Sequence, residues 1–187
     1  MSQYLTVDEI GYFPAGTMPT EGLVIRASAI IDGYCKRSIS VSTYTERIPL
    51  TNGRGHLSYY PVEKIDEVRG RAAYGLTGDT FFGTPGFELV DPTSIDVDKQ
   101  IGTVWCGGNL FGSPYSELEV TYSSGWDPIP EKVKVACGLL VGQIASNPNS
   151  NVKSKKDFDF SIEYFGGGMI NPEIADLLSE YTLRSFR

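Results

Sequence analysis

Apolar side chains recur at helical spacing near both ends of the chain and at strand spacing in between. Thr20 is a good N-cap and Glu21 a favourable first-turn anion, and the apolar positions after them predict a helix over 20–36. Proline at a first helical position and apolar periodicity predict further helices over 130–146 and 172–181. The predicted buried faces are Leu23, Ala27, Ile30, Ile31 and Tyr34; Val133, Ala136, Cys137, Leu140, Val141 and Ile144; and Ile174, Leu177, Leu178 and Tyr181.

A short helix is also expected over 6–12. Thr6 and Glu9 stand at the spacing of a capping box, in which each residue satisfies a backbone N–H of the other. Leu5 and Ile10 flank this pair as a hydrophobic staple would.

Between residues 38 and 125 the apolar period becomes two, which predicts about seven short strands. Asn52 and Gly53 favour the positive φ angles of a type I′ turn, so a hairpin is expected there, with residues 56–60 as its return strand. Trp105 and Trp126 are expected in the core or at an interface, and the core is favoured.

Residues 150–168 predict a flexible arm. Three lysines lie in a polar stretch, an apolar row alternates with acidic residues, and a glycine triplet follows as a hinge. Because an isolated arm of this kind is not stable alone, it has to pack on its own domain or on a neighbour. The residues are Lys153, Lys155 and Lys156; Phe158, Phe160, Ile162 and Tyr164; and Gly166, Gly167 and Gly168.

Helical ends around a β middle indicate an α+β fold, a small helical bundle with an inserted antiparallel β module. We expect residues 1–37 and 126–187 to form the helical framework and residues 38–125 to form the inserted module. The arm over 150–168 belongs to the framework. A chain of 187 residues is long enough to bury a sizeable core.

Charge argues against conventional DNA binding. Lys and Arg number 16 against 23 for Asp and Glu, which gives a formal net charge of -7. A protein that grips DNA phosphates needs a basic face, and this chain has no basic excess from which to build a large one. The 21 glycines and 11 prolines imply many turns, as several short strands require.

The three cysteines, Cys35, Cys106 and Cys137, lie far apart and lack the spacing of zinc or thioredoxin-like sites. We expect them to be buried free thiols of a soluble protein made in a reducing cytosol. No stretch approaches the length of a membrane span, and no metal or cofactor is expected.

Signals for catalysis are weak. The single histidine, His56, is expected on a solvated strand, and Asp96 and Asp98 are expected on one strand face. If these three side chains lined a pocket, they would favour a small hydrolase or a sugar-binding module. No catalytic residue is therefore assigned.

Several segments follow one another in a familiar order. They are Tyr4 to Ile10, Arg26 to Ser38, Glu46 to Leu50, Arg54-Gly55, Tyr60 to Ile65 and Val120 to Pro130. In this order they resemble the head–tail connector (adaptor) proteins of long-tailed bacteriophages. Small members of that family are almost wholly helical, so the β module is a departure from the pattern.

The resemblance implies a structural, non-enzymatic virion protein of the neck, assembled in the host cytoplasm. Such proteins form a ring of commonly about twelve copies below the portal protein, extend the DNA channel and provide a platform for the next neck or tail-completion protein. DNA would pass through the acidic ring without specific binding, repelled over about 8 Å. The implied portal-binding residues are Tyr181, Arg184, Phe186 and Arg187, and the expected inter-subunit residues are Lys153, Lys155, Lys156, Phe158, Phe160 and Tyr164.

Two further alternatives belong to other classes of protein. Stopper and tail-terminator proteins also form neck rings, but they are mostly β, whereas this chain predicts helices at both ends. A nucleic-acid-binding accessory protein is disfavoured by the acidic charge.

Overall fold

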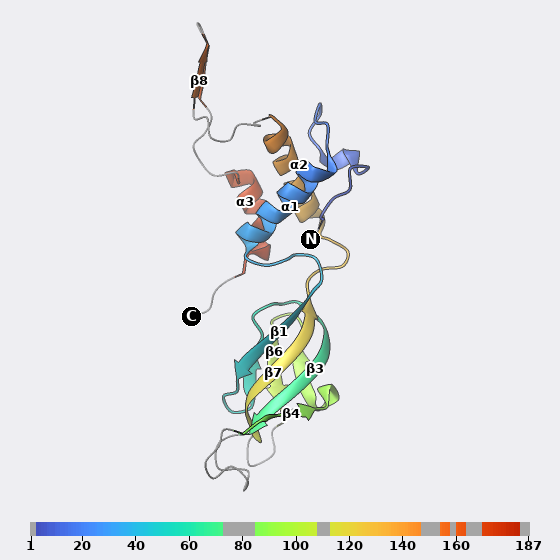
Figure 1. The fold of residues 1–187 in the computed structure, drawn as a ribbon, viewed down its shortest axis with the longest axis vertical. Helices are drawn as coiled ribbons and strands as arrows, with labels where there is room; N and C mark the ends of the chain where they lie inside the picture. Colours follow the sequence, from blue (N-terminus) through green and yellow to red (C-terminus); the bar gives the residue numbers. More distant parts are fainter. Residues whose placement is uncertain are drawn as a thin grey trace. The chain divides into compact units, whose positions relative to one another are not determined.

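The computed structural model of the chain describes residues 3–72, 85–107, 113–146, 154–157, 160–163 and 170–183. These residues form an α+β fold with three α-helices, two antiparallel sheets and a two-stranded hairpin (Figure 1). The chain divides into two compact units. We call residues 1–39 with 128–187 the helical unit, and residues 40–127 the β unit.

Three helices form the framework of the helical unit. They are α1 (Glu21–Cys35), α2 (Glu131–Ser146) and α3 (Pro172–Leu178), with 3₁₀ turns at η1 (Ile10–Tyr12) and η3 (Ser179–Tyr181). The three longer predicted helices are confirmed, although the last turn of the third is 3₁₀. Thr20 Oγ1 accepts a hydrogen bond from the backbone N of Leu23 at 3.4 Å, and Asn171 Oδ1 accepts one from Ile174 N at 2.8 Å. Both N-caps are therefore formed by side chains.

The buried face of α1 differs from the predicted one. Leu23, Ile30 and Tyr34 are not buried, and the buried positions are Val24, Ala27, Ser28, Ile31 and Cys35. Ser28 Oγ donates to the carbonyl of Val24 and lies 3.9 Å from Cys137 Sγ on α2. Ser28 therefore takes part in the contact between α1 and α2, and the other buried positions of α1 include both small and large side chains.

Two glycines let the N-terminal loop lie directly on α2. A Cβ added at Gly138 would lie 1.9 Å from the carbonyl oxygen of Tyr12, and one at Gly142 would lie 2.7 Å from Cγ of Pro14. Glycine costs a helix about 1 kcal/mol relative to alanine. The close approach of the loop explains why two glycines stand one turn apart in this helix. The other buried positions of α2 are the predicted Val133, Ala136, Cys137, Leu140, Val141 and Ile144.

The helix predicted over 6–12 is wrong, because the segment forms a turn followed by the single 3₁₀ turn η1. The capping-box contacts are present nevertheless, since Glu9 Oε2 accepts from Thr6 N at 2.9 Å and from Thr6 Oγ1 at 3.3 Å. The staple is absent: Leu5 is 1% exposed, but Ile10 is 73% exposed. Without a buried apolar stripe after Glu9, the turn does not extend into an α-helix.

Buried polar contacts hold this N-terminal segment in place instead. The hydroxyl of Tyr4 donates to the carboxylate of Asp32 and accepts from the backbone N of Ile39 at 2.9 Å. Lys134 Nζ on α2 contacts Glu9 Oε1 at 2.7 Å. The segment is thus anchored to both long helices.

Two antiparallel sheets make up the β unit. The strand order is β1-β7-β3-β4 in the larger sheet and β2-β6-β5 in the smaller one. The strands are β1 (Ser42–Pro49), β2 (Arg54–His56), β3 (Val62–Ala72), β4 (Phe87–Val90), β5 (Ile95–Asp98), β6 (Thr103–Cys106) and β7 (Tyr115–Ser124). The sheets share one core, to which Ile48, Val68, Val90, Ile95, Val104, Cys106, Leu118, Val120 and Tyr122 contribute.

The predicted turn at Asn52-Gly53 is confirmed, with φ angles of 53° and 76°. Its predicted return strand is wrong. Residues 54–56 form β2, which pairs with β6, whereas all eight residues of β1 pair with β7. A Cβ added at Gly55 of β2 would lie 2.9 Å from Cδ1 of Ile48 on β1, so β2 packs over the side chains of β1 instead of along its free edge. The turn therefore carries the chain from one sheet to the other.

A buried hydroxyl ties the connection after β2 to the larger sheet. Tyr122 on β7 donates to Glu46 Oε1 at 2.5 Å and accepts from the backbone N of Tyr59 at 3.1 Å. The same carboxylate oxygen accepts from Ser58 N at 2.7 Å, and the rings of Tyr44 and Tyr59 stack with centroids 4.0 Å apart. Burial, followed by the hydrogen bond to Glu46, raises the pKa of Tyr122 well above its usual value.

Candidate assembly surfaces

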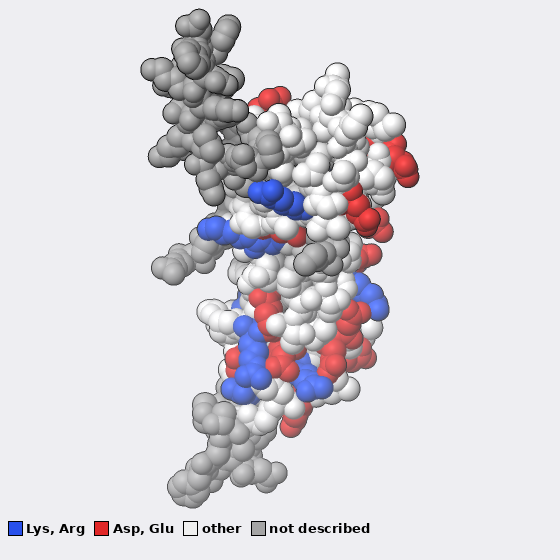
Figure 2. All heavy atoms as spheres, turned by 45° about the horizontal axis from the view of Figure 1, so that its top comes forward, with Lys and Arg blue, Asp and Glu red and all other residues white. Residues whose placement is uncertain are grey.

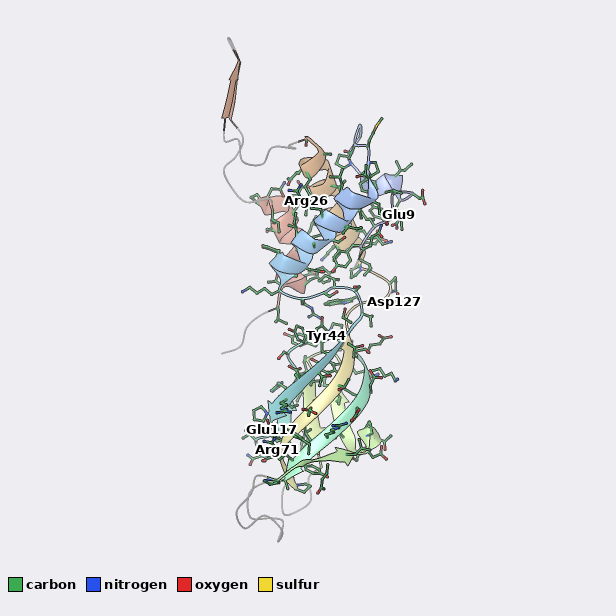
Figure 3. The ribbon with its side chains drawn as sticks, viewed as in Figure 1. Glu9, Arg26, Tyr44, Arg71, Glu117 and Asp127 are labelled. Carbon is green, nitrogen blue, oxygen red and sulfur yellow. The ribbon has the colours of Figure 1, made fainter. Side chains whose placement is uncertain are left out.

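Acidic and basic side chains pair with one another on the outer face of the larger sheet. Four ion pairs lie on its strands, Arg47–Glu119 at 2.7 Å, Lys64–Asp66 at 2.8 Å, Arg69–Glu67 at 2.5 Å and Arg71–Glu117 at 3.1 Å. Figure 2 shows acidic and basic side chains intermingled over the β unit, and Figure 3 shows Arg71 and Glu117 close together on it. Since exposed pairs of this kind contribute little stability, their main effect is to prevent a strong field of one sign.

Residues on which the hydrolase alternative depends, His56 and Asp98, lie on the smaller sheet but not on adjacent strands. The register aligns His56, Thr103 and Asp98 across the three strands, and His56 Nδ1 lies 3.2 Å from Thr103 Oγ1. Asp98 Oδ1 instead accepts from the backbone N of Gln100 at 3.0 Å. Because His56 and Asp98 lie on outer strands, roughly 9 to 10 Å separates their backbones. The arrangement gives no hydrogen-bonded catalytic pair.

An exposed aromatic residue, Trp105, lies two positions along β6 from Thr103. Trp105 is 43% exposed, so its favoured place in the core is wrong, and the interface alternative stays a prediction. Its strand, β6, alternates, and the buried positions are taken by Val104 and Cys106. The Arg54 guanidinium lies 4.2 Å from the centroid of the Trp105 ring. The two side chains together form a cation–π pair on the surface.

All three cysteines are buried free thiols, as expected. Burial raises the pKa of Cys35 and of Cys137 to about 11, and it also raises the pKa of Cys106. Since the thiolate is the reactive form, none of these groups is suited to nucleophilic chemistry. Among the described residues, no group of three or more His, Cys, Asp or Glu is placed to hold a metal ion. No described helix is long and apolar enough to cross a membrane.

The predicted portal-binding tail begins at a well-anchored position. Tyr181 lies in η3 and is partly buried, and burial followed by the charge of Glu180 raises its pKa. Lys132 Nζ contacts both carboxylate oxygens of Glu180 at 2.8 Å, and Leu183 N donates to the carbonyl of Cys35 at 2.9 Å. The chain is thus fixed against α1 and α2 up to Leu183. Arg184, Phe186 and Arg187 lie outside the described residues.

The predicted inter-subunit residues fall in and around a hairpin of β8 (Ser154–Asp157) and β9 (Phe160–Glu163). Lys155 is paired with Ile162, Lys156 with Ser161, and Asp157 with Phe160. In the described part of the chain, neither strand pairs with any other sheet. The other residues of the prediction, Lys153, Phe158 and Tyr164, lie outside the described residues.

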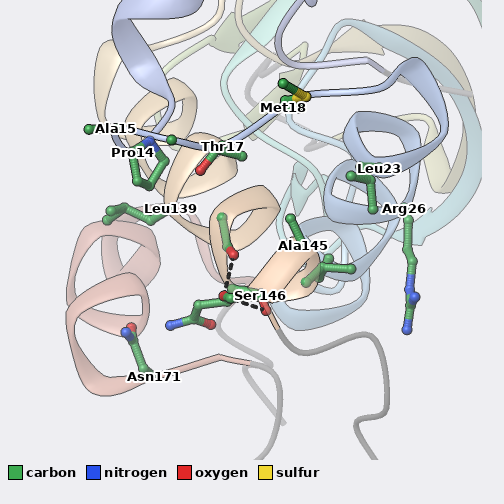
Figure 4. A pocket seen from close by; sticks show the side chains of 14 residues that line it. Pro14, Ala15, Thr17, Met18, Leu23, Arg26, Leu139, Ala145, Ser146 and Asn171 are labelled. Carbon is green, nitrogen blue, oxygen red and sulfur yellow. Dashed lines mark hydrogen bonds between the residues drawn. The ribbon is translucent and has the colours of Figure 1, made fainter.

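The helical unit also carries an open groove of about 860 Å³, shown in Figure 4. The loop before α1, the first turns of α1, the end of α2 and the N-cap of α3 form its walls. The lining includes Pro14, Ala15, Met18, Leu23, Arg26, Leu139, Ile144, Ala145, Ser146 and Asn171. Arg26 is the only one of the described lining residues with a charged side chain, and Met18 is 87% exposed.

No sequence motif marks this groove, because its walls come from three separate segments of the chain. The available signal is the pair of glycines at 138 and 142. Gly142 itself lines the groove and admits Pro14, which belongs to the opposite wall. Glycines one turn apart in a helix indicate a close approach, but they do not say which segment approaches.

Comparison with known proteins reveals a shared fold. A chain described as the neck of an empty GTA particle computed with C6 symmetry superposes with a TM-score of 0.57 at 16% identity, over 98% of this chain and 92% of that chain. A chain from the neck of a native GTA particle computed with C12 symmetry gives 0.52 at 15% identity, over 89% and 85% of the two chains.

A third similar chain comes from the virion of a native gene transfer agent (GTA) particle. It gives a TM-score of 0.52 at 18% identity, over 98% of this chain and 92% of that chain. No protein-family profile and no curated protein sequence matches this chain. At these identities the likeness is one of fold, and it extends over most of the chain.

Proposed function

We propose that this protein is a structural, non-enzymatic subunit of the neck of a virus-like particle, with the role of a head–tail connector (adaptor). The observation that carries the proposal is the coverage of the structural match. Because 98% of this chain corresponds to 92% of a neck chain, the match is not limited to one common substructure. The order of segments in the sequence points to the same class of protein independently.

In the proposed assembly the subunits form a closed ring below the portal protein. The similar neck chains come from structures computed with sixfold and twelvefold symmetry. A ring of about twelve copies agrees with both, since twelve is a multiple of six. Each subunit carries a formal charge of -7, so a ring concentrates negative charge around its channel. Passing DNA is then repelled within about 8 Å and slides without specific binding.

The two parts of the chain have separate tasks in this proposal. The helical framework of residues 1–37 and 126–187 binds the portal and adjacent subunits, and the β module of residues 38–125 extends the channel. Leu183 is held by the carbonyl of Cys35, so the tail after it leaves from a defined point. Tyr181, Arg184, Phe186 and Arg187 bind the portal, since arginine and aromatic side chains are frequent anchors of interfaces.

The test is the oligomeric state of the purified full-length protein, alone and mixed with the portal protein of the same particle. Native mass spectrometry and negative-stain imaging are expected to show a ring, formed alone or on the portal. A stable monomer that ignores the portal would contradict the proposal. Rings that bind the tail tube but not the portal would instead indicate a tail terminator.

A truncated variant ending at Leu183 gives a matched control for the tail. It keeps the contact of Leu183 with Cys35 but lacks the predicted anchors after it. Rings are expected to form while portal binding weakens at least tenfold, which corresponds to about 1.4 kcal/mol. Undiminished portal binding would show that the tail is not the anchor.

A further inference from the structure

The groove of the helical unit lies where the predicted arm leaves and rejoins that unit. Ser146 is the last residue of α2 and Asn171 is the N-cap of α3, and both line the groove. The residues between them, 147–170, contain the hairpin β8–β9 and the apolar row beside it. Arm and groove are therefore adjacent features of every subunit.

The groove and the arm have complementary chemistry. The groove presents apolar side chains such as Met18 and Leu139, with Arg26 as the charged group among its described lining residues. The arm presents an apolar row, residues 157–164, in which Phe158, Phe160, Ile162 and Tyr164 alternate in sequence with Asp157, Asp159, Ser161 and Glu163. Asp157 pairs with Phe160, so this row includes the reversal of the hairpin and is not one extended strand. Its apolar residues can pack on the apolar part of the lining while a carboxylate meets the guanidinium. Polar side chains also line the groove: Thr17, Gln143, Ser146 and Asn171.

A cyclic ring needs this kind of complementarity between two different surfaces. In a ring every subunit uses one surface to contact the preceding copy and another to contact the following copy. A two-stranded hairpin is marginal in water, and β8 and β9 join no other sheet of the described chain. Docking onto a neighbour would supply the packing that the hairpin needs.

We infer that the groove of one subunit binds the apolar row of the arm, residues 157–164, from the adjacent subunit of the ring. The inference rests on the proposed ring and names the contact that closes it. The lead-in of residues 147–153 spans at most about 25 Å when extended, which is enough to reach a neighbour in contact with the helical unit. Arg26 then fixes the register by binding one of the arm carboxylates.

Cysteine cross-linking between differently labelled subunits tests the contact. One full-length variant carries Met18→Cys in the groove, and a second, with a mass tag, carries Ser161→Cys between two apolar residues of the arm. The native cysteines are buried, and burial raises the pKa of each thiol, so they compete little for a short bis-maleimide reagent. The two variants are mixed, assembled alone or on the portal, and treated.

A cross-linked heterodimer of the two variants is the expected result. The control replaces Met18→Cys with Lys36→Cys, an exposed residue just after the opposite end of α1, roughly 20 Å from Leu23 at the helical rise of 1.5 Å per residue. The control pair is expected to give at most a tenth of the heterodimer. Equal yields from both pairs would overturn the inference.

Charge reversal provides a second, independent readout. Arg26→Glu is expected to lower the cross-link yield about fivefold, the effect of losing a partly exposed ion pair and adding repulsion. Lys36→Glu makes the same change of charge at the C-cap of the same helix and is expected to leave the yield unchanged. Equal losses in both variants would show a nonspecific effect of charge and would count against the inference.

The failure of the inference and the failure of the proposed function are distinguishable in the same samples. If rings form but positions 18 and 161 do not cross-link, the proposed neck function is still supported and the inferred binding of the arm to the groove is overturned. A link found only within single chains of a doubly substituted variant shows that the arm fills its own groove, which also overturns the inference. Monomers under every condition, with or without portal, overturn both.

Discussion

Replacing Gly138 by alanine tests the closest contact of the helical unit, the one between α2 and the loop after η1. Alanine favours a helix over glycine by about 1 kcal/mol, so the substitution would stabilise an isolated α2. The added Cβ, however, would lie 1.9 Å from the carbonyl oxygen of Tyr12. Nonbonded contacts to a Cβ are essentially never closer than 3.0 Å, so the loop backbone has to move by at least 1.1 Å.

The size of the effect follows from these opposing contributions. Overpacking a well-packed core costs about 1 to 3 kcal/mol, and here the obstacle is backbone rather than the end of a flexible side chain. Because backbone yields less than a side chain, we take the upper part of that range, about 2 to 3 kcal/mol. Subtracting the gain of about 1 kcal/mol in helix propensity leaves an expected loss of about 1 to 2 kcal/mol for Gly138→Ala. Gly142→Ala should lose less, because its Cβ meets the ring of Pro14 at 2.7 Å and that ring can shift.

Gly33→Ala is the matched control for this prediction. Gly33 also lies in a helix, α1, but nothing lies within 4 Å of a Cβ built on it. We expect this variant to gain up to 1 kcal/mol. Thermal unfolding followed by circular dichroism should show Tm rising by about 2 to 4 °C for Gly33→Ala and falling by about 2 to 8 °C for Gly138→Ala. If Gly138→Ala were as stabilising as Gly33→Ala, the loop would not lie on α2.

Three further predictions concern buried and paired groups. Tyr122→Phe leaves Tyr59 N–H and the Glu46 carboxylate without their buried partner, so urea unfolding should show a loss of about 1 to 3 kcal/mol, whereas an unchanged midpoint would contradict this contact. Native protein should bind almost no Ellman reagent, while the protein unfolded in urea should bind three equivalents, since burial holds the thiol pKa values high; fast labelling of the native protein would refute this. The hydrogen bond from Lys134, followed by that from the Thr6 backbone, lowers the pKa of Glu9 below 4.5, so its stabilisation is present above that pH and is lost as the pH falls through the native pKa. Glu9→Gln should therefore be less stable than the parent at pH 7 but nearly equal to it at pH 3, and an equal difference at both values would exclude the effect.

The candidate surfaces were predicted unevenly. The tail and the arm are continuous segments. The composition of the arm marks the row from Phe158 to Tyr164 as contact residues, whereas the role of Tyr181 was implied by the family resemblance, and both roles stay predictions. The groove is built from three segments, and no local pattern reports that Met18, Leu139 and Asn171 lie around one hollow. Only the packing of the N-terminal loop on α2 brings the walls of the groove together.

Local sequence determined the features that depend on a few consecutive residues. Thr20 and Asn171 begin helices because their side chains satisfy backbone N–H groups three residues later, and Asn52-Gly53 turns because both residues tolerate positive φ angles. The alternation of β7 likewise shows which side chains face the core. These outcomes follow from hydrogen bonds and steric limits that operate within four or five residues.

Only the tertiary structure decided which partner each of these elements meets. On α1, Val24, Ser28 and Cys35 face inward although the apolar periodicity favoured Leu23 and Tyr34, because the side of the helix that is covered depends on its contacts with α2 and the N-terminal segment. The segment after the Asn52-Gly53 turn pairs with β6 because it packs over the Ile48 side chain of β1 instead of along the free edge of that strand. Which segments pack or pair depends on competition between surfaces that are distant in sequence. The residue pattern of one segment carries no information about the competing segments.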